Sequence, residues 1–88
     1  MIIINILKSI FGKTNFVSKY NLTNKSLRNI QEKLIYKNTL TNDELICIDY
    51  LQTRFIKKPK NEKQNLHNQK EARTIGVNLD LVLSILNL

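Results

Sequence analysis

The sequence predicts a small, mainly α-helical domain, and three observations support this class. Apolar residues recur at helical spacing in two consecutive segments, 24–37 and 41–58. A strong helix-start signal, LTNDEL at 40–45, separates the two segments. The leucine-rich segment 77–88 also favours a helix, because Leu is a better helix former than strand former. We therefore expect a single domain, 1–88, built on a helical hairpin with apolar segments at both ends.

The first segment, MIIINILKSIF, has apolar residues at helical spacing, at Ile3, Ile6, Leu7 and Ile10. Gly12 follows directly and predicts a left-handed helix cap, with Lys13 beside the carbonyl end. The triplet GKT at 12–14 also ends the phosphate-binding P-loop. That loop needs a glycine five residues before its GK pair, and this chain has Leu7 there. We therefore interpret GKT as the end of a helix.

Residues 13–23 predict a connector, either an ordered loop or a short extended piece. Four of its side chains can dock on a core: Phe16, Val17, Tyr20 and Leu22. In the following segment, 24–37, Leu27, Ile30 and Leu34 lie on one stripe among polar residues. This pattern predicts an amphipathic helix that Asn38 ends.

The second helix of the hairpin begins within LTNDEL. Thr41 can cap the helix and Glu44 can reach back to the Thr41 amide, while Leu40 and Leu45 occupy the positions of a hydrophobic staple. The helix must stop before Pro59. We expect three of its apolar residues to face inward: Ile48, Leu51 and Phe55.

The segment 57–73, KKPKNEKQNLHNQKEAR, has six basic residues against two acidic ones, and Leu66 and Ala72 are its only aliphatic residues. It is compatible with a solvated helix, a flexible linker, or a segment that becomes ordered on an anionic partner. Lysine and arginine supply the phosphate contacts of nucleic-acid-binding proteins. The candidate nucleic-acid-binding residues are therefore Lys57, Lys58, Lys60, Lys63, Lys70 and Arg73.

The last segment, VNLDLVLSILNL, allows two interpretations. As a strand, its apolar residues alternate with polar ones; as a helix, Asn78 caps it and Asp80, Ser84 and Asn87 share one face. We favour the helix. If the strand formed instead, residues 1–7 could be its partner and the fold would be α+β.

Composition restricts the source and the compartment. Leu, Ile, Asn and Lys dominate, and the codons for Ile, Asn and Lys are rich in A and T, which indicates a low-GC genome. The single cysteine, Cys47, excludes an internal disulfide framework, fits a reducing compartment and is expected to be buried. No segment approaches the roughly 20 apolar residues of a membrane span, and no export signal is apparent. We expect an intracellular protein of an organelle matrix or bacterial cytoplasm.

The sequence offers no catalytic constellation. One Cys and one His, twenty residues apart, do not make a metal site. His67 has no partner that would make it a catalytic base, and we expect it to face solvent or RNA. Asp49, beside Tyr50, is expected to bond Arg54 or a neighbouring helix. We therefore predict a protein that is not an enzyme, with no metal, cofactor or small-molecule substrate.

Fourteen basic residues against seven acidic ones give a net charge of +7, which attracts polyanions. We predict a non-catalytic, RNA-binding structural subunit of a ribonucleoprotein, such as a ribosomal protein from an organelle, with neighbouring protein subunits on its apolar ends. The alternatives are an accessory subunit of a protein-only complex, such as a respiratory assembly, and a phage or plasmid DNA-binding regulator. Asp43 and Glu44 disfavour the regulator, because a recognition helix meets DNA near its N-terminus.

Overall fold

The computed structural model describes residues 16–88, and this part of the chain contains helices and no strand. The helices follow in the order α2 (Asn24–Ile35), α3 (Asn42–Arg54), α4 (Glu62–Ile75) and α5 (Leu79–Leu86). The predicted mainly α class is confirmed, and residues 77–88 do not form the alternative strand. The predicted N-terminal helix, its Gly12 cap and the possible strand partner at 1–7 lie outside the described residues.

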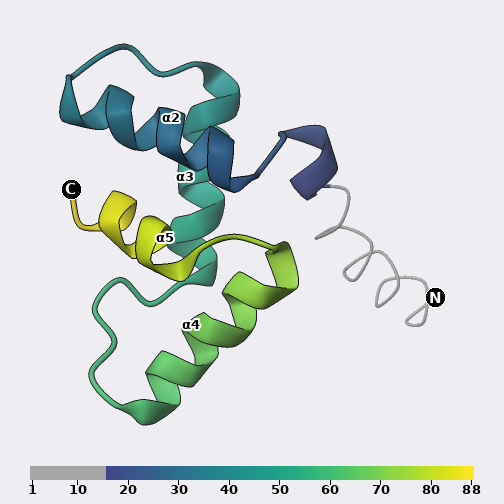
Figure 1. Cartoon of the computed structure of the whole chain (residues 1–88), viewed down its shortest axis with the longest axis vertical. Helices are drawn as coiled ribbons and strands as arrows, with labels where there is room; N and C mark the ends of the chain where they lie inside the picture. The colour runs from purple at the N-terminus through teal and green to yellow at the C-terminus, as the bar shows by residue number, and fades with distance from the viewer. Residues whose placement is uncertain (1–15) are drawn as a thin grey trace.

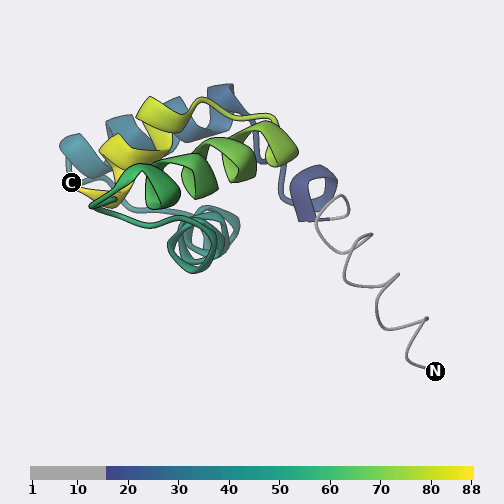
Figure 2. The same cartoon turned by 90° about the horizontal axis from the view of Figure 1, so that it is seen from below.

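Helix α5 is the centre of the domain, because α2, α3 and α4 all pack against it and α2 does so most extensively. Figure 1 shows α5 between α2 and α4, with α2 and α3 crossing each other. In Figure 2, helices α2, α5 and α4 form one layer, and α3 lies on one side of that layer. The two predicted consecutive helices, α2 and α3, are therefore present, but both pack mainly against α5. The most buried core side chains come from the connector before α2 and from α2, α3 and α5: Leu22, Leu27, Ile30, Cys47, Leu51 and Val82.

The helix starts are set by side-chain caps. At α3, the Glu44 amide donates to Thr41 Oγ1 over 3.2 Å and the Thr41 amide donates to Glu44 Oε1 over 2.8 Å, which confirms the predicted capping box. Lys33 Nζ lies 2.7 Å from the same carboxylate. Partial burial alone would raise the pKa of Glu44, but the bonds from Lys33 and Thr41 outweigh it and hold this pKa below its usual value. Of the staple residues, Leu40 packs on the core and Leu45 remains 51% exposed.

The inward faces agree with the apolar stripes. Leu27 and Ile30 of α2 are buried and Leu34 is partly buried, while α3 buries Leu51, with Phe55 just after its end. Ile48 is partly buried, as are Phe16, Val17 and Tyr20 in the connector. Cys47 is 2% exposed, as predicted. Burial, together with nearby Asp43 and Glu44, raises the pKa of its thiol, so Cys47 is a core side chain whose reactive thiolate form is disfavoured.

The observed elements differ from the approximate predicted bounds at three places, two of them before α3 and one at its end. Residues 16–19 are helical, so the connector contains a helical turn where an ordered loop or extended piece was expected. Helix α2 ends at Ile35, before the predicted residue 37, because Lys37 is left-handed with φ 57°. The Lys37 and Asn38 amides then bond the Leu34 and Lys33 carbonyls, which closes the helix end.

Helix α3 ends at Arg54, four residues before the predicted 58. Phe55 is extended, with φ −114° and ψ 147°, and its side chain is buried. The amide and carbonyl of Ile56 are both bonded to the side chain of Asn68 on α4. The chain therefore leaves the helix before Pro59 can stop it, because a tertiary contact supplies the backbone hydrogen bonds.

Two helix ends contain a residue with left-handed backbone angles, Lys37 after α2 and Gly76 after α4, and substitutions at them should change stability in opposite directions. Gly76, with φ 75°, ends α4, and a Cβ atom built on it would contact nothing within 4 Å. Gly76→Ala should therefore lower the free energy of unfolding by about 1 kcal/mol through backbone strain alone. Lys37→Gly should raise it by up to about 1 kcal/mol, because glycine removes the same strain. Chemical denaturation measures both, and a change of equal sign in the two variants would contradict this assignment.

Candidate nucleic-acid interface

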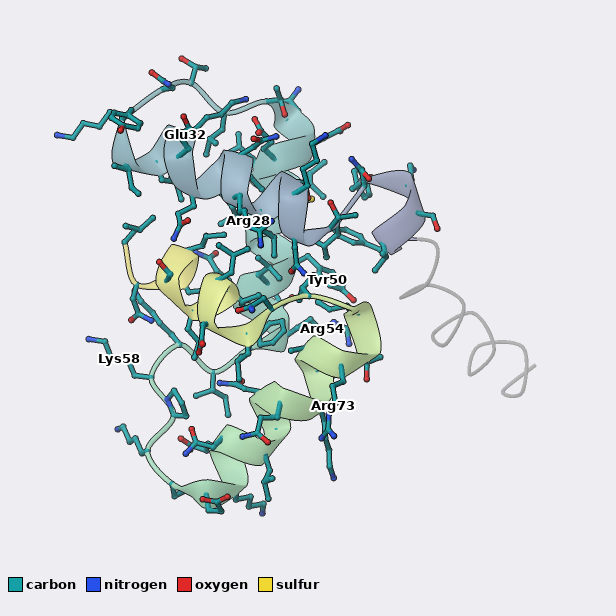
Figure 3. All side chains as sticks on the ribbon, in the orientation of Figure 1. Arg28, Glu32, Tyr50, Arg54, Lys58 and Arg73 are labelled. Atoms are coloured by element: carbon teal, nitrogen blue, oxygen red, sulfur yellow. The ribbon has the colours of Figure 1, made fainter. Side chains whose placement is uncertain are left out.

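The six basic residues predicted to bind nucleic acid lie at the α4 end of the molecule. Three belong to the α3–α4 connection and three to α4 itself, and all six are exposed. In Figure 3, Lys58 projects from the connection on one side of α4 and Arg73 projects from α4 on the other. The structure therefore spreads these residues along the edge of the domain formed by α4 and the α3–α4 connection, on both sides of the helix, and does not focus them on one point. We call this set the basic surface: Lys57, Lys58, Lys60, Lys63, Lys70 and Arg73.

The backbone of the α3–α4 connection is held by Asn68. Its Oδ1 atom accepts from the Ile56 amide over 2.8 Å, and its Nδ2 atom donates to the Ile56 carbonyl over 2.9 Å. Asn68 is 0% exposed and is the one buried polar residue among those described. Because a buried amide must be bonded, this pair fixes the connection onto α4. Asn68 lies within the segment 57–73, where no local pattern distinguishes it from its exposed neighbours.

Three further side chains bond the same connection. His67 Nε2 lies 3.0 Å from the Arg54 carbonyl, and Asn87 Nδ2 donates to the Lys57 carbonyl over 3.0 Å. The Lys60 amide donates to Gln64 Oε1 over 2.7 Å. A carbonyl can only accept, so Nε2 of His67 carries the proton. The flexible-linker interpretation of this segment is therefore wrong, because the lysines project from a backbone that is already tied to α4 and α5.

The outer face of α4 presents the other three basic residues. Asn61 caps the helix, and Asn68, Ala72 and Ile75 form its buried face. The opposite face carries Lys63, Lys70 and Arg73 at positions i, i+7 and i+10, with Leu66 between them and 42% exposed. These positions span roughly 15 Å along the helix axis. The solvated-helix interpretation of residues 62–75 is therefore right, and it produces a basic stripe.

Among the residues that the structure describes, none of the six basic side chains forms a salt bridge. An ion pair joins Lys33 and Glu44, at the other end of the domain. Glu62 stands in the first turn of α4, where a carboxylate complements the helix dipole. The basic surface is therefore free to attract an anionic ligand.

Arg54 belongs to a different environment. Its guanidinium carbon lies 5.2 Å from the centre of the Tyr50 ring, and Phe16 stacks on the same ring with centroids 4.0 Å apart. Burial raises the pKa of the Tyr50 hydroxyl even though Arg54 opposes the shift. Asp49 is exposed and no bond joins it to Arg54, so that predicted pair is absent. Figure 3 shows Tyr50 and Arg54 together at the α3 end.

A shallow groove adjoins the basic stripe. Gln69, Ala72 and Arg73 line it from α4, and Val77 and Leu79 line it from the start of α5. Its volume is about 330 Å³. The sequence analysis missed this groove, because it depends on how the turn at Gly76 folds residues 77–79 back along α4. The spacing of Gln69 and Arg73, four residues apart on one helix, is the signal that could have indicated a shared surface.

No family model, curated protein or solved structure matches the chain. Within residues 16–88, no three side chains of the metal-binding types lie together. The helices of this part of the chain are also too short or too polar to cross a membrane. The assignment of the basic surface therefore depends on its own charge and geometry.

Proposed function

We propose that the protein binds RNA through the basic surface and acts as a non-catalytic structural subunit of a ribonucleoprotein particle. A ribosome of an organelle with an AT-rich genome is the assembly that best fits the composition. The observation that carries this proposal is the set of six unpaired cations on one edge of the domain. Three of them project from a connection that hydrogen bonds hold in place.

The geometry favours contact with the phosphate backbone. Each Lys or Arg can form a charge-assisted hydrogen bond with a phosphate, and the bonded connection limits the loss of backbone freedom on binding. Base reading in a DNA major groove is less favoured, because α3 and α4 both carry acidic residues in their first turn, where a recognition helix meets the bases. A surface that follows the backbone suits RNA, whose narrow major groove does not admit a helix.

Substitution of the α4 stripe tests this function. The variant Lys63→Gln, Lys70→Gln, Arg73→Gln should bind an RNA stem-loop at least about tenfold more weakly near physiological salt. The slope of log K against log salt should also fall by about 2, since three phosphate contacts are removed. Fluorescence anisotropy of a labelled stem-loop at several KCl concentrations measures both quantities.

The matched control removes the same charge elsewhere. Lys25, Arg28 and Lys37 are exposed at α2, and the variant with all three replaced by Gln has the same net charge as the stripe variant. It should retain most of the RNA affinity. An equal loss in both variants would show that only net charge matters, and a lack of RNA binding by the native protein would favour the protein-only complex. Tighter binding to duplex DNA than to RNA would favour the regulator.

A second test uses the protein in its native lysate. The proposal predicts sedimentation with a large particle that nuclease treatment dismantles, with the protein identified by mass spectrometry of the fractions. Sedimentation in a nuclease-resistant complex would instead support an accessory subunit of a protein-only assembly.

A further inference from the structure

The groove beside the basic stripe has an apolar floor and a polar rim. Ala72 is 4% exposed and Val77 is 9% exposed, while Leu79 is partly buried and packs against the core. Gln69 and Arg73, one helical turn apart, are exposed at the rim. The volume of about 330 Å³ is at the lower limit of ligand pockets. A groove of this size suits a single planar ring system better than a larger ligand.

The chemistry of the rim matches a nucleotide. The Gln69 amide presents a donor and an acceptor next to each other, as the edge of a nucleobase does. The planar guanidinium of Arg73 can pair with a phosphate through two hydrogen bonds or stack on a base. Arg73 belongs both to the groove and to the basic surface, so a strand following Lys63 and Lys70 would bring its next nucleotide to the groove.

We propose that this groove receives one unpaired nucleobase of the bound RNA. The base would lie on the floor of Ala72, Val77 and Leu79, with its edge bonded to Gln69 and the adjoining phosphate on Arg73. The preferred ligand is then a single-stranded or bulged segment, because bases inside a duplex are stacked and cannot turn outward without a cost. This inference rests on the proposed function and adds that the recognised RNA has at least one unpaired base.

The test compares strands that differ only in their bases. The 88-residue chain is titrated into a labelled single-stranded RNA, into an abasic strand of equal length and charge, and into the corresponding duplex. We expect the base-containing strand to bind about tenfold more tightly than the abasic strand, which corresponds to about 1.4 kcal/mol of contacts between the base and the groove. Gln69→Ala should bring this ratio close to one while leaving affinity for the abasic strand within about twofold. Gln52→Ala, which changes an exposed glutamine on α3, should leave the ratio unchanged.

The outcomes separate the two proposals. Equal affinity for the base-containing and abasic strands, or tighter binding of the duplex, would overturn the base site and leave phosphate binding intact. A ratio that Gln69→Ala does not alter would also overturn it, because the base would then lie elsewhere. Failure of the native protein to bind any of the three ligands would overturn the proposed function together with the base site.

Discussion

Replacement of Asn68 by alanine is expected to lower the free energy of unfolding by about 3 kcal/mol, a large part of the stability of a domain of this size. The side chain is 0% exposed and bonds both the amide and the carbonyl of Ile56. Its loss leaves two backbone groups unpaired at a partly buried position and opens a small cavity beside them. Urea denaturation followed by circular dichroism measures the change.

Asn65→Ala is the matched control, since Asn65 is exposed on the same helix. It should be neutral or slightly stabilising, because alanine is the better helix former. A loss of less than about 1 kcal/mol in Asn68→Ala would show that water replaces both bonds to Ile56.

The variant Asn68→Asp adds a dependence on pH. An ionised carboxylate can accept from the Ile56 amide but cannot donate to the Ile56 carbonyl, and burial disfavours its charge. Burial therefore raises the pKa of the new carboxyl in the folded state above its value of about 3.9 in the unfolded chain. The destabilisation should be smallest below the unfolded-state pKa of about 3.9. It should grow as the pH rises from there through the raised folded-state pKa. Chemical denaturation at pH 4 and at pH 7 compares the free energy of unfolding of Asn68→Asp at the two pH values.

Val82→Asp is expected to abolish cooperative folding. Val82 is 0% exposed on α5, the helix against which α2, α3 and α4 all pack. The substitution removes an apolar side chain from the core and places a charge there without a partner, and each change costs a few kcal/mol. The thermal transition followed by circular dichroism should disappear, and the amide proton spectrum should lose its dispersion.

Leu88→Asp provides the comparison, because Leu88 is 61% exposed two residues after α5. It introduces the same side chain and should leave the transition within a few degrees of the wild type. A transition of normal cooperativity in Val82→Asp would contradict the central position of α5.

Much of the fold could be predicted because local signals agree with the tertiary structure. The cap at Thr41 and Glu44 determines where α3 begins, and the stripe of Leu27, Ile30 and Leu34 determines which face of α2 is inward. Both signals depend on residues within one or two helical turns. The choice of helix for the last segment was also right, since leucine-rich periodicity and the Asn78 cap favour the same state.

The end of α3 and the state of the basic segment could not be predicted, because both depend on a contact across the chain. Asn68 looks like another polar residue of an asparagine-rich segment until α4 brings it onto the Ile56 backbone. The buried face formed by Asn68, Ala72 and Ile75 extends beyond the basic segment 57–73, because Ile75 lies after its end. Leu66, one of the two aliphatic residues of this segment, is 42% exposed.

The sequence identifies the six basic residues as candidates, and their binding role stays a prediction, whereas the shape of the surface around them could not be predicted. The six basic residues are all exposed and unpaired among the described residues, as a phosphate-binding surface requires. The groove of Gln69 and Arg73 depends on the left-handed turn at Gly76, which orients residues 77–79. Sequence periodicity describes single helices and carries little information about the junction between two of them.

The position of α5 has a consequence for how a newly made chain matures. α5 is the last of the described helices to leave the ribosome during synthesis, yet the earlier helices pack mainly on it. Its side-chain bonds to α2 join Asn24 with Asn78 and Gln31 with Ser84, which are 54 and 53 residues apart. A nascent chain that ends at α4 therefore lacks the helix against which α2, α3 and α4 all pack, and contacts this distant in sequence form slowly. The basic surface is therefore complete, and ready for the RNA ligand that we propose, only after residues 79–86 have emerged and Asn87 has bonded the carbonyl of Lys57.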